Sequence, residues 1–499
     1  MAIRITGLNS GLDTESIISE LVSAKKVSVN NLKKEKTKLS WKVDAWKSLN
    51  TKILSMYSTI DKLRFDSAYV KKKSTVSQSG ILSVVAGETS VNGVQTASVE
   101  SLAKAGYLTG GKLKTADGGK VTADTKVTDL GIAAGSSFKI NGQEVTIDAD
   151  TTMSGLVTQL KAGGVDVNFD ENQQRLYVSA KETGKDNDFS FAGDDALLKT
   201  LGLIEDSSNP DGAVKIKGEN AVMYLNSARY ESTTNTFQVN GTTYTATGVS
   251  DKNADGSLKE VSITTMDDYD GIYDTIRDFF KQYNGLINEM DKLYNAESSK
   301  GYEPLLSEEK EALTDTEVEE WEKKIKDSLL RKDSSLSSVI SSMTTTMMGS
   351  ISVNGKDMYL SSFGIATLGY FNAEDNEKHA YHIAGDPNDT SVAEGKDILK
   401  SMIASDPETV KSFFSQMANN LYKSMGTTLE RIPDFKSYRK VYNDQQLNKE
   451  LEEYESKIKK ADEALTAYED KWYKKFGEME TALSKLSSKQ NAISSLFSS

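Results

Sequence analysis

The sequence contains no cysteine and only two histidines, His379 and His382, among its 499 residues. The missing thiols exclude disulfides, cysteine-ligated metal centres and thiol nucleophiles. Histidine is the side chain that most often carries acid–base chemistry near neutral pH, so its scarcity argues against an enzyme. We therefore expect no catalytic residues, no bound cofactor and no metal site.

Proline and long apolar runs are also scarce. Only five prolines occur, and the first of them is Pro210, so the preceding chain can form long uninterrupted helices. No run of about 18 apolar residues is present, which excludes a transmembrane helix. The first residues lack the apolar core and the small-residue cleavage site of a secretory signal. We expect neither membrane insertion nor a cleaved signal peptide.

Charge is distributed unevenly along the chain. The net charge is -13, yet residues 21–73 hold fourteen lysines and arginines against four aspartates and glutamates. A basic stretch of this kind is typical of nucleic-acid binding. Here the lysines alternate with a heptad pattern, and no cluster of aromatic residues for base stacking accompanies them. We interpret them as the solvated face of a helix and expect no nucleic-acid partner.

Heptad repeats of apolar residues occupy both ends of the chain. The first repeat predicts a helix from Thr14 to Phe65, with Asp13 or Thr14 as its N-cap. The heptad positions form an apolar stripe along each helix, which we call the seam, and a helix cannot bury it alone. We therefore expect the two terminal helices to pack against each other. The alternative is that each helix packs on a globular core. The seam residues are Ile18, Val22, Val29, Leu32, Leu39 and Val43, with Leu451, Ile458, Leu465, Trp472, Met479 and Leu486. Five polar interruptions, which we expect to fix the register, are Lys25, Lys36, Asn50, Lys475 and Lys489.

The middle of the chain is rich in strand and turn signals. Asn141-Gly142 and Asn240-Gly241 lie inside alternating apolar runs, which predicts type I′ hairpins. A short helix is expected over 152–162, and helical periodicity returns at Asp270. The predicted fold class is a multidomain α+β chain with terminal antiparallel coiled-coil helices, an α/β middle domain and inserted β-rich domains, so that the chain runs out and back. The predicted domains are a coiled-coil domain of 1–42 and 440–499, a mostly helical domain of 43–77 and 267–439, a β-rich domain of 78–130 and 203–266, and an inserted β-rich domain of 131–202.

Three motifs resemble ligand sites, and each lacks one feature that its site requires. Residues 106–113 nearly match a P-loop, but Leu113 stands where a magnesium-binding Ser or Thr is required. Residues 251–262 begin like an EF-hand loop and end on Ser262 instead of a bidentate Glu. His379 and His382 would point to opposite faces of a strand. We interpret all three motifs as structural. No sequence feature singles out a pair of carboxylates that could act as the acid and base of a hydrolase.

The opening residues, Gly7-Leu8-Asn9-Ser10-Gly11-Leu12-Asp13-Thr14, resemble the start of the flagellar filament cap proteins, the flagellar hook-associated protein 2 family. The stretch 138–179 is similar to the flagellin hook IN repeat, and 321–333 and 363–365 resemble the family's C-terminal half. The matches touch most of the chain. The motif residues carried over from the family are Gly7, Leu8, Ser10, Gly11, Leu12 and Asp13.

The resemblance implies a role in flagellar assembly. Family members leave the cell through the flagellar type III channel without a cleaved signal, and form a closed ring, a pentamer or similar, at the extracellular tip of the filament. There they prevent loss of flagellin and promote its folding and polymerisation. The implied partners are further copies of the chain, flagellin, hook–filament junction proteins, an export chaperone and, in some members, host mucin. The alternative function is a surface adhesin, with a coiled-coil stalk that displays glycan-binding or mucin-binding β domains.

Overall fold

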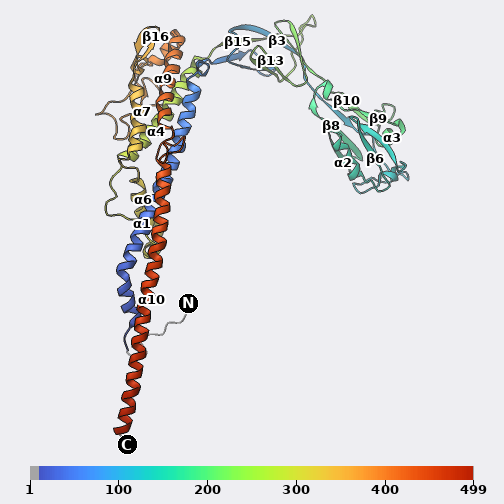
Figure 1. The fold of residues 1–499 in the computed structure, drawn as a ribbon. Coiled ribbons are helices and arrows are strands. Elements are labelled where there is room, and N and C mark those ends of the chain that lie inside the picture. The colour runs from blue at the N-terminus through green and yellow to red at the C-terminus, as the bar shows by residue number, and fades with distance from the viewer. Residues whose placement is uncertain (1–10, 498–499) are drawn as a thin grey trace. The chain divides into compact units, whose positions relative to one another are not determined.

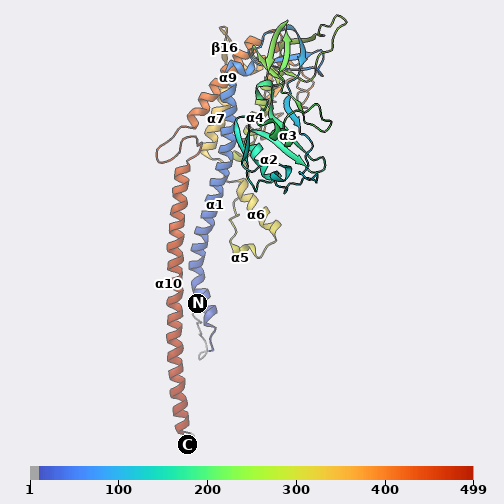
Figure 2. The same cartoon turned by 90° about the vertical axis from the view of Figure 1, so that its right-hand side faces the viewer.

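The computed structural model describes residues 11–497 and divides the chain into two compact units. Unit 1 combines both ends of the chain, residues 1–69 and 272–499, and unit 2 is the continuous segment 70–271. Unit 2 is therefore inserted into unit 1, and the chain runs out and back. Figures 1 and 2 show the two views of the ribbon.

Two long helices dominate unit 1. Helix α1 (Thr14–Leu63) begins where Asp13 caps it, because the Asp13 carboxylate accepts a hydrogen bond from the Ser16 N–H. Helix α10 (Asp444–Phe497) contains a single glycine, Gly477, and no proline. The other elements are η1 (Asp66–Tyr69), α4 (Tyr269–Tyr294), α5 (Ser307–Lys310), α6 (Asp315–Asp327), α7 (Ser334–Met348), β16 (Ile351–Val353), β17 (Lys356–Met358), η4 (Leu360–Phe363), β18 (Ile365–Ala366), β19 (His382–Ile383), α8 (Ile398–Ser405) and α9 (Pro407–Thr428).

The core of unit 1 lies around the second half of α1. Helices α4, α7 and α9 pack there, and each has an apolar face with helical spacing. Phe363, Phe413 and Phe414 form an aromatic cluster with ring centroids 4.5–5.3 Å apart. The Ser- and Met-rich stretch of α7, which could have been helix or loop from its sequence, is a helix capped by Asp333. The first half of α1 is outside this core and packs mainly on α10.

Unit 2 is built from small antiparallel sheets around two apolar cores. One core, which we call the inner core, draws on residues from Leu108 to Ala213. The other, which we call the outer core because its strands flank this segment in the sequence, draws on β2, β3, β11, β14 and β15. The elements are β1 (Lys72–Val76), β2 (Leu82–Ala86), β3 (Gly93–Ser101), β4 (Ala105–Thr109), η2 (Val127–Leu130), β5 (Ser136–Ile140), β6 (Gln143–Ile147), α2 (Met153–Ala162), β7 (Val165–Asp170), β8 (Arg175–Thr183), η3 (Lys185–Asn187), β9 (Phe191–Gly193), α3 (Asp195–Thr200), β10 (Val214–Ile216), β11 (Ala221–Leu225), β12 (Ala228–Ser232), β13 (Thr236–Val239), β14 (Thr242–Ala246) and β15 (Val261–Asp267).

Both predicted hairpins are present in unit 2. Strands β5 and β6 meet at Asn141 and Gly142, with φ of 51° and 82°. Strands β13 and β14 meet at Asn240 and Gly241, with φ of 47° and 74°. These left-handed conformations are the ones a type I′ turn requires, and Asn and Gly adopt them at low cost. The hairpin predictions are therefore confirmed.

The predicted fold class is confirmed, with mixed helix and sheet and a β-rich segment inserted between two helical halves. The strand orders are β1-β15-β3-β11-β12, β10-β4-β8-β7, β13-β14-β2 and β6-β5-β9 in unit 2, with two short ladders in unit 1. The predicted domain boundaries after residues 42, 77, 130, 202, 266 and 439 remain predictions. Because the inner core begins at Leu108, it extends further along the chain than the predicted segment 131–202.

Candidate assembly interface

Helices α1 and α10 lie side by side and antiparallel (Figures 1 and 2). Their register is set by polar contacts across the pair. The Lys33 ammonium lies 3.1 Å from the Asp462 carboxylate, and that of Lys36 lies 2.9 Å from Glu455. About two helical turns before Lys33 on α1, the Lys25 ammonium lies 4.6 Å from the centre of the Tyr468 ring. The two ends of the chain thus form one helix pair.

The seam between the two helices is unevenly buried. On α1, Ile18, Val22, Val29 and Val43 are buried, while Leu32 and Leu39 are half-buried. On α10, the five seam residues from Leu451 to Met479 are all half-buried, and Leu486 is 66% exposed. A helix covered by one neighbour leaves part of each seam side chain in water, whereas a bundle of several helices covers it. Helix α10 therefore retains apolar surface that one copy of the chain does not cover.

One polar residue of the seam, Asn50, makes contacts other than those its heptad position predicts, whereas Lys25 and Lys36 contact α10 as expected. Asn50 is buried, and its side-chain amide bonds the backbone of the segment that precedes α10: it donates to the Arg439 carbonyl at 3.3 Å and accepts from the Val441 N–H at 3.0 Å. The interpretation of Asn50 as a polar position inside the helix pair is therefore wrong. It joins α1 to the returning chain before the pair begins.

The lysines of α1 also face a third partner, the segment 303–327 that contains α5 and α6 and that we call the α5–α6 arm. Lys26 contacts Glu308 at 3.1 Å, and Lys34 contacts Glu309 at 2.7 Å. Just past the arm, Asp333 contacts Lys42 at 2.9 Å. The interpretation of these lysines as a solvated face is wrong for Lys34, whose side chain is only 16% exposed.

Electrostatics holds the arm in place. Partial burial of Glu309 opposes its ionisation, but the Leu306 N–H and the Lys34 ammonium outweigh this effect and lower the pKa of the carboxyl group. Within the arm, Glu322 is buried and lies 3.0 Å from the Lys326 ammonium, which also lies over the Trp41 ring of α1. Ion pairs that are partly exposed are weak and are screened by salt. The contact between arm and α1 is therefore expected to depend on ionic strength.

We expect Lys34→Glu to loosen the arm and the double change Lys34→Glu with Glu309→Lys to restore the contact in part, because a lysine at 309 no longer accepts the hydrogen bond from the Leu306 N–H. Loss of a contact worth about 1 kcal/mol changes an opening equilibrium about fivefold. Hydrogen–deuterium exchange of the α6 amides should therefore accelerate about fivefold in the single variant at low salt, and the difference should shrink at high salt. Equal exchange in the single and double variants would show that the ion pair does not hold the arm.

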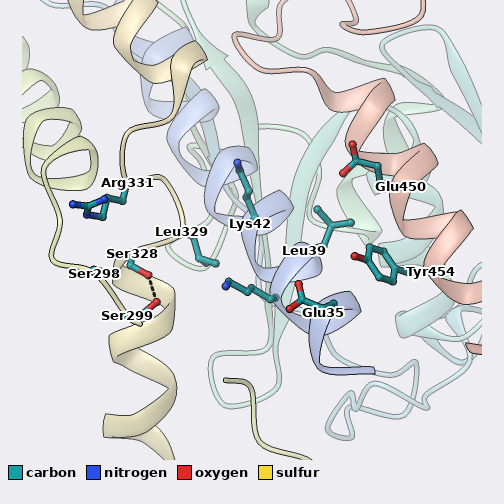
Figure 3. A pocket seen from close by; sticks show the side chains of 11 residues that line it. Glu35, Leu39, Lys42, Ser298, Ser299, Ser328, Leu329, Arg331, Glu450 and Tyr454 are labelled. Carbon is teal, nitrogen blue, oxygen red and sulfur yellow. Dashed lines mark hydrogen bonds between the residues drawn. The ribbon is translucent and has the colours of Figure 1, made fainter. Parts of the chain in front are cut away.

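A pocket of about 450 Å³ lies where α1, α10 and the ends of the arm meet (Figure 3). Leu39, Leu329 and Tyr454 supply its apolar part. The charged residues at its edge are Glu35, Lys38, Lys42, Arg331 and Glu450. Leu39, a predicted seam residue, therefore borders a crevice at this level, and the two helices are not packed closely along their full length.

The two histidines each pair with a different aspartate. His379 Nδ1 lies 2.7 Å from the buried carboxylate of Asp291 on α4, and His382 Nδ1 lies 2.6 Å from Asp389. The hydrogen bond to Asp291 raises the pKa of His379, although partial burial and the Lys378 charge oppose this shift. Each histidine thus anchors a loop, which agrees with the structural interpretation.

The His379–Asp291 pair makes the stability of unit 1 depend on pH. Because the pKa of His379 is raised in the folded state, its contribution is complete below the unfolded-state pKa of about 6.5 and is lost as pH rises through the folded-state pKa. The free energy of unfolding should fall over this range in the native chain and stay flatter in the His379→Gln variant. Parallel curves for the two chains, measured by urea denaturation from pH 5.5 to 9, would contradict this assignment.

The other motifs have structural explanations. The backbone N–H groups of Gly110, Gly111 and Leu113 donate to the carbonyls of Leu176, Gly202 and Gln174, so none is free to hold a phosphate. In the EF-hand-like loop, Asn253 and Ser257 close a turn, and the Lys259 ammonium lies 3.5 Å from Asp251. Within residues 11–497, no three His, Asp or Glu side chains gather as metal ligands.

The family motif lies at the start of α1. Gly7, Leu8 and Ser10 fall outside the described residues. Gly11 has a φ of +66°, a left-handed conformation that favours glycine, Leu12 is exposed, and Asp13 is the N-cap of α1. Of these three residues, Asp13 sets where α1 begins. Among the helices of the part described, none combines the length and the apolar character needed to span a bilayer.

Comparison with protein families decides the relationship. The model of the "Flagellar hook-associated protein 2 C-terminus" matches residues 218–488, more than half of the chain, and the corresponding N-terminal model matches residues 10–106. The chain belongs to the flagellar hook-associated protein 2 family. The family predicted from the sequence resemblance is therefore confirmed. It is a family of structural flagellar proteins. Its two matched segments contain both α1 and nearly all of α10.

Individual members of the family are distant in sequence. A flagellar hook-associated protein 2 of Halalkalibacterium halodurans is 23% identical over 99% of this chain and 100% of its own length. The Escherichia coli K12 member is 28% identical over 47% of this chain and 51% of its own length, so the match spans about half of that relative. A crystal structure of the flagellar cap protein FliD from Escherichia coli, domains D1-D2-D3, aligns with a TM-score of 0.46 at 20% identity and covers 76% of this chain and 95% of that one.

Proposed function

We propose that this chain caps the flagellar filament at its distal tip, outside the cell, where it retains exported flagellin and promotes its folding and polymerisation. The observation that carries the proposal is the terminal helix pair of a flagellar hook-associated protein 2 family member, in which α10 keeps a half-buried apolar seam. A function in assembly accounts for this surface, because further copies of the chain or flagellin can cover it.

The half-covered surface of α10 supports further copies of the chain as a partner, and the other proposed partners are those that family membership implies. Copies of the chain would associate head to tail into a closed ring, a pentamer or similar, because heterologous contacts close when the rotation between copies permits it. Flagellin, hook–filament junction proteins and an export chaperone are the other proposed partners. The half-buried residues Leu451, Ile458, Leu465, Trp472 and Met479 and the exposed Leu486 are the proposed contact residues on α10.

The proposed route to the tip is the flagellar type III channel, without a cleaved signal peptide. A chain that is threaded unfolded through a narrow channel cannot carry cross-links, and this sequence has no cysteine. The weakly held α5–α6 arm and the half-covered α10 are elements that can order late in folding. These features support export of the unfolded chain.

Deletion of the gene tests the proposal. A strain that lacks the chain should secrete flagellin monomers into the medium and carry short or missing filaments, and a plasmid copy of the gene should restore both. Electron microscopy and an immunoblot of the medium measure these outcomes. Filaments of normal length in the deletion strain would overturn the proposal. The family match favours the cap over the adhesin alternative, and mucin binding stays a prediction.

A further inference from the structure

Unit 1 displays a pair of aromatic side chains in solvent. They lie on the loop between β18 and β19, residues 367–381, which we call the aromatic loop. Phe371 is 97% exposed and Tyr370 is 70% exposed, with their ring centroids 5.6 Å apart. Neither residue is part of the core of unit 1. Exposed aromatic rings of this size are typical anchors of protein–protein contacts, because their burial releases water from a large apolar area.

The stem of the aromatic loop is held firmly on α4. Asn284 donates to the Tyr381 carbonyl at 2.7 Å and accepts from the Tyr381 N–H at 2.8 Å, as a neighbouring strand would. His379 is held by the buried Asp291. The tip is therefore presented on a fixed base, and little conformational entropy needs to be lost when a partner covers it.

A pocket lies at the foot of the same loop. It measures about 300 Å³, and its apolar lining includes Met347 and Met348 at the end of α7, Tyr359, Ile365 and Tyr381. An apolar cavity of about 150 Å³ is large enough to bind benzene, so a phenylalanine ring fits here. Methionine side chains adapt to an aromatic ring and make favourable sulfur contacts with it. Phe371 of the same chain does not fill the pocket, since nearly all of its surface is in solvent.

The charges around the loop tip and the pocket are complementary. Beside the aromatic pair the loop carries Glu374, Asp375 and Glu377, and the Asp375 side chain is fully exposed although it contacts Lys378 at 2.9 Å. Lys378 and His379 line the pocket; within one chain Lys378 pairs with Asp375 and lies 4.2 Å from the centre of the Tyr370 ring, and His379 pairs with the buried Asp291, so Glu374 and Glu377 are the acidic residues left to meet a cation of a second copy. An acidic, aromatic tip thus matches an apolar pocket with a cationic edge.

We infer that a second copy of this chain is the partner: Phe371 of one copy inserts into the pocket between Met348 and Tyr359 of the other, and its acidic neighbours meet Lys378 there. The tip and the pocket belong to one short stretch, residues 344–381. Each copy thus carries both a tip and a pocket, so two copies can contact each other twice, as in an isologous contact. This pairing does not rest on the capping function and is distinct from the contacts of the helix pair.

Cysteine exchange tests this contact, because the native chain contains no cysteine. One full-length chain carries Phe371→Cys, a second carries Met348→Cys, and the two are mixed under mild oxidation. We expect a disulfide that joins the two chains, since the inserted side chain lies within bonding distance of the pocket wall. The control replaces Phe371→Cys by Val91→Cys, which introduces a thiol at a position 70% exposed in unit 2.

Two outcomes would overturn the inference. One is a yield of mixed disulfide no higher than that of the Val91→Cys control. The other is an intrachain disulfide in the monomeric double variant Phe371→Cys with Met348→Cys, which would show that the loop closes on its own pocket. As a second measurement, Phe371→Asp should weaken self-association in sedimentation experiments at least tenfold, while Val91→Asp should leave it unchanged. Equal association of these two variants would likewise contradict the pairing.

Discussion

A strain whose only copy of this chain carries both Leu465→Asp and Trp472→Asp will not build long filaments, although residues 70–271 of the variant keep their fold. Both residues are half-buried on α10, at the level where α1 presents Val22 and Val29. Trp472 packs its ring against Tyr468 and Phe476, with centroids 6.2 Å apart in each case, and the Lys475 ammonium lies over it. Two aspartates remove this apolar surface and place two charges in the seam.

The effect is expected to be nearly complete, because the helix pair receives little support from elsewhere. Beyond the core of unit 1, α10 has α1 as its main neighbour, so loss of the seam frees α10, whereas α1 keeps its ion pairs with the α5–α6 arm. Filament length measured by electron microscopy gives the functional result, and circular dichroism of the purified variant reports the loss of helix. Unit 2 shares no core residue with the seam, so the melting transition of its sheets should not move.

Leu486→Asp, at an exposed residue that is also a proposed contact residue, is the matched control for the stability of the helix pair. Leu486 is a seam residue by sequence but is 66% exposed in the single chain, so the free protein should tolerate the aspartate without loss of stability. If Leu486→Asp also blocks filament growth, the outer part of α10 contacts another molecule in the assembled state. Long filaments from the Leu465→Asp, Trp472→Asp strain would refute the role of the helix pair.

Replacing Trp46 by alanine will lower the free energy of unfolding of unit 1 by about 3–5 kcal/mol. Trp46 is 1% exposed and stacks on Tyr442, with ring centroids 5.2 Å apart and planes tilted by 7°. It lies one helical turn from Asn50, which bonds the backbone around Val441. The side chain therefore fills the place where α1 meets the chain returning from α9. In the alanine variant a cavity replaces it, and α1 loses its packing on the returning chain.

Guanidinium denaturation followed by circular dichroism measures this loss. The transition of unit 1 should move to lower denaturant concentration, and the transition of unit 2 should stay in place. Trp321→Ala is the control, because that side chain is half-buried on the α5–α6 arm, where its indole N–H donates to the Glu303 carbonyl. Trp321→Ala should lower the free energy of unfolding clearly less than Trp46→Ala does. Equal losses for the two tryptophans would mean that Trp46 has no special place in the core.

Much of the fold is predictable because local signals agree with the tertiary structure. The Asp13 cap, the proline-free start and the heptad spacing together predict α1, whose observed end, Leu63, lies two residues before the predicted one. Asn-Gly pairs predict the hairpin turns, since few other residues adopt the left-handed conformation cheaply. The short helix α2 follows from Thr152 as cap and from Leu156 and Leu160 on its buried face. Each of these signals lies within a few residues of the structure it predicts.

The sequence by itself determined the family, the two terminal helices and the inserted β-rich segment, because helix periodicity, turn residues and a terminal motif are local properties. Only the tertiary structure decided which carboxylates meet the lysines of α1: Lys34 pairs with Glu309, 275 residues away, and Lys33 pairs with Asp462, 429 residues away. It also placed Asn50 against the returning chain and left Phe371 exposed on a loop whose foot borders a pocket. Contacts between segments so far apart depend on how the whole chain packs, and no periodicity within one segment encodes its partner.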